Sequence, residues 1–132
     1  MKRANYIGAP EFFCLNGACR IVEEAFNFSH GTYLVGSSLH KRDYRDVDVR
    51  TILPDVEYDR LFPEKFGSDW RHPLWSFMCS SMSLYLSRHS GLKIDFQIQR
   101  MTEANAEYPS PEHERCAIGQ FVYRAPPKET PE

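Results

Sequence analysis

The spacing of hydrophobic positions changes along the chain and predicts helices alternating with strands. Residues 9–28 carry apolar side chains three or four positions apart, as one face of an amphipathic helix requires. Gly17 lies inside this segment, so we expect the helix to start late or to break there. Residues 73–89 repeat the spacing with bulkier side chains and are followed by Gly91, a suitable C-terminal cap for a buried helix. A shorter helix is expected within residues 54–66.

Three segments have the composition or the alternation of β-strands. Residues 32–35 are β-branched, aromatic or aliphatic, and residues 46–53 and 93–99 alternate between polar and apolar positions. Residues 101–114 are polar and contain two prolines, so we expect a loop with at most one helical turn. Residues 117–123 are expected to form a fourth strand at the edge of the sheet.

This order of elements predicts an α+β fold, with a small mixed β-sheet packed on one side by helices. The chain has 132 residues, which is enough for one domain and too few for two. We place that domain at residues 1–124 and expect the proline-rich residues 125–132 to be a disordered tail. The formal net charge of −2 argues against a general nucleic-acid binder, since there is no overall positive field.

Cysteine usage indicates a reducing compartment and a cytoplasmic protein. The four cysteines include no Cys-x-x-Cys pair, although two disulfides remain an alternative. No apolar run follows the basic residues near the start, and no segment has the length of a membrane span, so neither a signal peptide nor membrane insertion is expected. His113 and Cys116 have the spacing of half a zinc site, but no second pair accompanies them.

A candidate phosphate-binding turn follows the first strand. Gly36 provides a backbone that allows a tight turn or close approach of a phosphate, and Ser37 and Ser38 add hydroxyl groups. The loop after the turn carries three cations, Lys41, Arg42 and Arg45. His30 and His40 flank the region and could contact a nucleotide, although such histidines are more often plain loop residues. The turn is therefore a candidate for binding phosphate.

Two carboxylates open the second strand and a third lies on another strand. Strand alternation puts Asp46, Asp48 and Arg50 on one face. The two carboxylates would then lie roughly 6–7 Å apart, close enough to hold one or two divalent ions. Asp95 lies on the polar face of its own strand and completes a triad if that strand is a neighbour. In such sites the third carboxylate ligates the ion or takes a proton from the nucleophile.

The ordered set of Gly36-Ser37, Asp46-x-Asp48 and a later Asp95 resembles the polymerase-beta-like nucleotidyltransferase superfamily, and the small size suggests its minimal branch. The resemblance covers about residues 30–100, with a short connection of eight residues between Ser37 and Asp46. It implies that Gly36 and Ser37 hold the nucleotide phosphates, that Asp46 and Asp48 bind Mg²⁺ or Mn²⁺, and that Asp95 is the third acidic residue.

The resemblance also implies the function. We expect transfer of a nucleoside monophosphate from a nucleoside triphosphate to an acceptor hydroxyl, with Asp46, Asp48 and Asp95 as catalytic and metal-binding residues. Ser38 and Arg50 are expected to contact the nucleotide. The acceptor would be a protein, such as a tyrosine within a toxin and antitoxin pair, a nucleic-acid end or a small molecule. A partner protein such as a toxin, or a second copy of the chain, would supply the acceptor-binding surface.

Three other readings stay open at this stage. The chain could be a catalytically silent module that keeps nucleotide or metal affinity and works by interaction. It could be a magnesium-dependent phosphohydrolase with water as nucleophile. Finally, Asp46 and Asp48 could be only the solvated face of an edge strand beside an ordinary turn.

Overall fold

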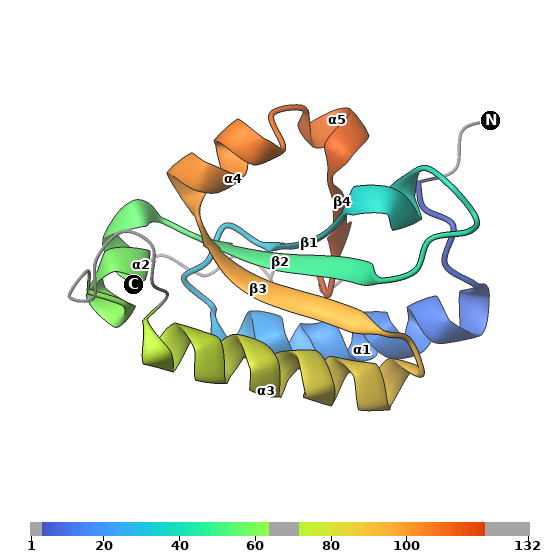
Figure 1. The fold of residues 1–132 in the computed structure, drawn as a ribbon, viewed down its shortest axis with the longest axis horizontal. Helices are drawn as coiled ribbons and strands as arrows, with labels where there is room; N and C mark the ends of the chain where they lie inside the picture. The colour runs from blue at the N-terminus through green and yellow to red at the C-terminus, as the bar shows by residue number, and fades with distance from the viewer. Residues whose placement is uncertain (1–3, 64–71, 121–132) are drawn as a thin grey trace, which may run out of the picture.

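The computed structural model describes residues 4–63 and 72–120 and shows an α+β fold. Within these residues, four strands form one mixed sheet in the order β3-β2-β1-β4. Figure 1 shows the long helices α1 (Ala9–Ala25) and α3 (Pro73–Ser90) below the sheet and the short helices α4 (Met101–Glu107) and α5 (Pro111–Glu114) above it. The expected α+β class, with a small mixed sheet packed by helices, is confirmed, and helices lie on both faces of the sheet rather than on one side.

The sheet combines one parallel pair with two antiparallel pairs. β1 (Thr32–Val35) runs antiparallel to β2 (Val47–Leu53) and to β4 (Cys116–Ile118). β3 (Ile94–Arg100) runs parallel to β2. A parallel pair needs a crossover connection, and here the crossover includes α2 (Asp55–Leu61) and α3 (Pro73–Ser90). β2 consequently lies between β1 and β3, in the interior of the sheet.

The two long helices, α1 (Ala9–Ala25) and α3, cover the apolar face of the sheet. They pack against each other and bury the alternate apolar side chains of β2 and β3, among them Val47, Val49, Leu53, Phe96 and Ile98. The Trp75 indole N–H of α3 donates to the carbonyl of Ile98 at 2.8 Å. This face is the core, so the polar residues that alternate with it lie on the opposite face.

The segment 101–114 differs from the expected loop. It forms α4 (Met101–Glu107) and α5 (Pro111–Glu114), which lie across the polar face of the sheet (Figure 1). A residue outside this segment holds the start of α4, since the Asp55 carboxylate accepts a hydrogen bond from the Thr102 amide at 3.0 Å. Arg115 donates to the carbonyls of Ala104 and Tyr108, both at 3.1 Å, and holds the end of α4. Both partners lie outside the segment, and Asp55 is distant in sequence, so the composition of residues 101–114 gave no sign of them.

The other differences between the expected and the observed limits of helices and strands are smaller. Helix α1 continues through Gly17, so the expected late start or break is wrong. The Gly17 backbone is accommodated because neighbours on both sides, Leu15 and Ala18, are buried and fix the helix by packing. β4 lies at the sheet edge as expected, but residues 121–123 of the expected strand, residues 64–66 of the expected second helix and the tail at 125–132 lie outside the described residues.

In the part of the chain that the structure describes, no helix combines the length and the apolar character needed to cross a lipid bilayer. The four cysteines are all free thiols, so the alternative of two disulfides is not observed.

Candidate functional site

The turn after β1 brings its glycine against a carboxylate. Gly36 has φ of +80° and begins a 3₁₀ turn, η1 (Gly36–Leu39). A Cβ added to Gly36 would collide with Oδ2 of Asp48. Two features therefore favour glycine at position 36: its backbone has a positive φ, and the Asp48 carboxylate occupies the space that a side chain would need.

The two serines of the turn have different surroundings. Ser37 is half-buried, and its carbonyl accepts from the amides of His40 and Lys41, each at 3.0 Å. Ser38 is fully buried, and its hydroxyl has no hydrogen-bond partner among the described residues. Ser37 is thus the hydroxyl of this turn that a ligand can reach.

The parallel register pairs Asp48 of β2 directly with Asp95 of β3. Directly paired residues of neighbouring strands have side chains on the same face, so the two carboxylates are neighbours, as expected from the sequence. Burial raises the pKa of Asp48 above its usual range, and the carboxylates of Asp95, Asp46 and Glu107 raise it further against an opposing effect of Arg50. The face therefore holds an excess of negative charge.

Asp46 lies just before β2 rather than within it, because the strand begins at Val47. Its Oδ1 lies 3.5 Å from Nζ of Lys93, the residue that precedes β3, but makes no hydrogen bond. The Lys93 side chain is 82% exposed, so this ion pair is weak and easily exchanged. Asp46 is at the same end of the sheet as Asp48 but is paired with a cation.

Arg50 follows on the same face and is buried, with 7% of its surface exposed. Its Nη1 donates to the carbonyl of Asp95 at 2.8 Å and to that of Val49 at 3.1 Å, and its Nη2 lies 3.9 Å from the Asp95 carboxylate. Arg50 is expected from the sequence to contact the nucleotide, but in the structure it bridges β2 and β3 and engages Asp95.

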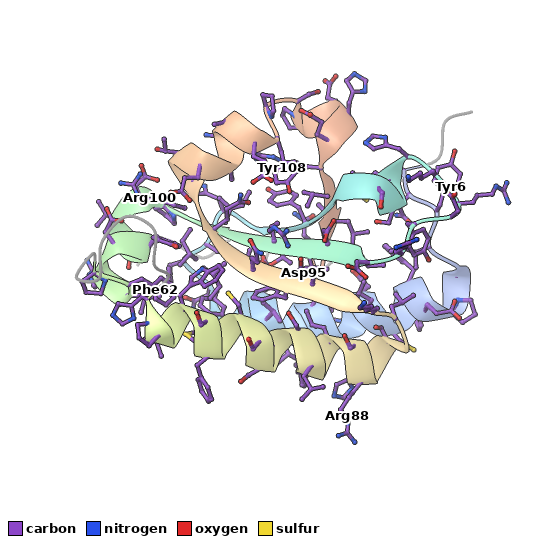
Figure 2. The ribbon with its side chains drawn as sticks, viewed as in Figure 1. Tyr6, Phe62, Arg88, Asp95, Arg100 and Tyr108 are labelled. Atoms are coloured by element: carbon purple, nitrogen blue, oxygen red, sulfur yellow. The ribbon has the colours of Figure 1, made fainter. Side chains whose placement is uncertain are left out.

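Helix α4 brings two further residues to this face that the sequence pattern did not indicate. Glu107 accepts a hydrogen bond from Gln99 of β3 at 2.7 Å. Tyr108 follows α4, and Figure 2 shows it between the short helices and the sheet that carries Asp95. Burial raises the pKa of the Tyr108 phenol, Arg50 lowers it, and Glu107 and Asp48 raise it. No spacing signal joins residues 107 and 108 to β2, so only the packing of α4 could find them.

The carboxylates of this face are suitable ligands for a divalent ion, although their side chains do not converge on one point. In residues 4–63 and 72–120, no group of three His, Cys, Asp or Glu side chains lies close enough to hold an ion. Asp46 and Asp95 are instead directed to Lys93 and Arg50. The donor chemistry and the register still fit a hard cation, because Asp48 and Asp95 are paired and the lack of a side chain at Gly36 leaves room for the Asp48 carboxylate.

The remaining candidate residues lie away from this cluster or at its rim. His30 and His40 are exposed, as are Lys41, Arg42 and Arg45 of the loop before β2. Cys116 accepts a hydrogen bond to its sulfur from the Asn5 amide at 3.6 Å. His113 and Cys116 are therefore not joined by a third ligand in the described part of the chain.

Comparison of the chain with protein-family models, with curated proteins and with solved structures finds no match. The chemistry of the site therefore has to be inferred from its own geometry.

Proposed function

We propose that the chain is a magnesium-dependent nucleotidyltransferase that moves a nucleoside monophosphate from a nucleoside triphosphate to an acceptor hydroxyl. The observation that carries this proposal is the contact of Gly36 with Asp48, together with the direct pairing of Asp48 and Asp95. These contacts bring the start of the Gly-Ser turn and two strand carboxylates into one small region, although Asp95 is far from the other two residues in the sequence. The resemblance of the motif to polymerase-beta-like nucleotidyltransferases requires such a meeting.

Each residue has a role in this proposal. Asp46, Asp48 and Asp95 hold Mg²⁺ or Mn²⁺, which neutralises charge on the transferring phosphate when it is bound. Gly36 and Ser37 bind the triphosphate through backbone N–H groups and the Ser37 hydroxyl, since the first amides of a helical turn have no partner within it. Asp95 accepts the proton of the acceptor hydroxyl. Lys93 releases Asp46 at little cost because the Lys93 side chain is exposed and their contact is not a hydrogen bond.

The test is pyrophosphate release from each of the four nucleoside triphosphates with Mg²⁺ and with candidate acceptors, namely a tyrosine-containing protein, an oligonucleotide and a small hydroxyl compound. An acceptor is needed because pyrophosphate leaves only as the acceptor oxygen bonds to the transferred phosphate. Wild type and Asp48→Asn are compared. Asp43→Asn is the matched control, because it makes the same change of charge at an exposed carboxylate of the adjacent loop. We expect release by wild type and by the control and loss of at least about a hundredfold in Asp48→Asn. If no triphosphate yields pyrophosphate above the level of Asp48→Asn, the transferase proposal fails.

A second candidate function is a catalytically silent module that binds a nucleotide or a metal for interaction. The ion pairs of Asp46 with Lys93 and of Asp95 with Arg50 favour it, since they compensate two of the three carboxylates without any metal. Binding of a nucleoside triphosphate that depends on Mg²⁺ and Asp48, with no pyrophosphate release in the presence of candidate acceptors, supports this second function.

A further inference from the structure

We propose that Arg50 is a positioning residue and the resident counter-cation of the carboxylate cluster, so that it competes with the divalent ion for Asp95. This inference rests on the metal site of the proposed function. It changes the expected role of Arg50, from a contact to the nucleotide to a contact within the protein.

The first step is the anchoring of the guanidinium. The short bonds of Arg50 go to backbone carbonyls, at 2.8 Å to Asp95 and 3.1 Å to Val49. The bond to the Asp95 carbonyl crosses from β2 to β3 at the register position of the acidic pair, and the bond to Val49 stays within β2. They fix the β3 backbone beside Asp48, and a planar guanidinium with several donors is suited to this task while a lysine ammonium is not.

The second step is the loose contact with the carboxylate. Nη2 of Arg50 lies 3.9 Å from Oδ2 of Asp95, which is beyond hydrogen-bond distance. The Asp95 side chain is 47% exposed while that of Arg50 is 8% exposed. The attraction is therefore electrostatic and leaves the carboxylate oxygens open to another cation from the solvent side.

The third step is the charge of the surroundings. Arg50 is buried, and its Nε has no hydrogen-bond partner among the described residues. Four carboxylates act on the same region, since Asp95, Asp46 and Glu107 all influence Asp48 together with Arg50. One buried cation beside these anions stabilises the face without a metal, and it leaves a negative surplus that a divalent ion can neutralise.

The test measures Mn²⁺ affinity of the purified full chain without nucleotide, from the electron paramagnetic resonance signal of free Mn²⁺. Arg50→Met removes the charge and keeps the side-chain length, and we expect it to bind Mn²⁺ about tenfold more tightly. Arg50→Lys keeps a charge, so its Mn²⁺ affinity is expected to stay within about twofold of wild type, while loss of the bonds to the two carbonyls should lower its melting temperature. The matched control is Arg100→Met, which removes a cation from the other end of β3, where it pairs with Asp55 and Asp59. Its affinity should not change.

The proposal predicts a second effect in the same variant. Arg50→Met should melt at a lower temperature than wild type without metal, and the difference should shrink with saturating Mn²⁺, because the ion then replaces the missing charge. A residue with only a structural role would lower the melting temperature without raising metal affinity. Unchanged or weaker Mn²⁺ binding by folded Arg50→Met, an equal gain in Arg100→Met, or no binding by any of the proteins overturns the proposal.

If Arg50→Met does not fold, wild type itself provides the test. In protein labelled with ¹⁵N-arginine, titration with Mg²⁺ should shift the Arg50 Nε–H resonance and leave that of Arg100 in place. An Arg50 signal that does not respond to Mg²⁺ contradicts the inference. Failure of the transferase proposal is distinct, because it shows as metal binding that depends on Asp48 and Arg50 without pyrophosphate release.

Discussion

The carboxylate of Asp48 occupies the space where a side chain of Gly36 would lie. The contact joins the turn after β1 to the start of β2 across the antiparallel pair, in which Val35 is the register partner of Asp48. It explains why a residue with φ of +80° and no Cβ is found at this turn. The contact also defines the first experiment.

Gly36→Ala should destabilise the protein and abolish the proposed activity. A left-handed backbone costs a residue with a Cβ about 1–2 kcal/mol, and displacement of Asp48 adds an overpacking cost of about 1–3 kcal/mol. The measurement is urea unfolding together with pyrophosphate release.

Gly91→Ala is the control for Gly36→Ala, since Gly91 has φ of +77° and no atom within 4 Å of an added Cβ. It should lose only the backbone cost and keep its activity. An equal loss of stability in the two variants would mean that the contact with Asp48 is unimportant. Gly17→Ala, in an open helical position, should instead gain about 0.5–1 kcal/mol.

Asp48→Asn should be more stable than wild type at neutral pH. Burial and the neighbouring carboxylates raise the pKa of Asp48, so its ionised form is disfavoured in the folded state. The amide removes this penalty, and we expect a gain of about 0.5–2 kcal/mol, the usual range for a single stabilising change. Such a gain at a residue required for activity would mark a functional site.

The pH dependence of that gain follows from the direction of the shift. A raised carboxyl pKa gives a stabilising contribution that is complete below the ordinary value of 3.8 and is lost as pH rises through the folded-state pKa. The advantage of Asp48→Asn over wild type should therefore shrink as pH falls from 7 toward 4 in chemical denaturation. An advantage that grows on acidification would contradict the shift.

Trp75→Phe should destabilise the packing of α3 on the sheet by about 1–3 kcal/mol. The change leaves the buried carbonyl of Ile98 without its 2.8 Å hydrogen bond from the indole. Guanidinium unfolding followed by circular dichroism measures the loss. Phe77→Ser, at a side chain that is 69% exposed on the same helix, should stay within about 0.5 kcal/mol of wild type. A similar loss in both variants would argue that α3 packs differently.

The thiols should differ strongly in reactivity in the folded protein. Burial, with a smaller contribution from Glu23, raises the pKa of Cys19 to about 12, so this thiol stays protonated at ordinary pH. Cys14 is exposed, Cys116 is partly exposed and Cys79 is buried. Titration with a disulfide reagent at pH 8 should modify Cys14 rapidly and Cys116 more slowly, while Cys19 and Cys79 react only after unfolding. Rapid modification of Cys19 in the native state would show that α1 opens locally.

Local patterns in the sequence determined much of the fold. The strand at residues 93–99, the helix at 73–89 and the edge position of the fourth strand follow from alternation, helical spacing and capping, which act between residues close in the chain. The Gly-Ser turn and the paired aspartates were visible for the same reason. Local patterns did not predict the helices of segment 101–114, because Asp55 and Arg115, which lie outside the segment, hold α4 in place.

The sequence by itself determined which residues carry the candidate chemistry, namely Gly36, Ser37, Asp46, Asp48 and Asp95, and which face of each strand is polar. Only the tertiary structure decided that β2 and β3 pair in parallel with Asp48 opposite Asp95, since register depends on how the crossover helix packs. It also decided that Arg50 is buried across that pair and that α4 brings Glu107 and Tyr108 over it. A strand pattern fixes where a side chain points relative to its own backbone, but its charged neighbours are set by strands and helices that arrive from elsewhere in the chain.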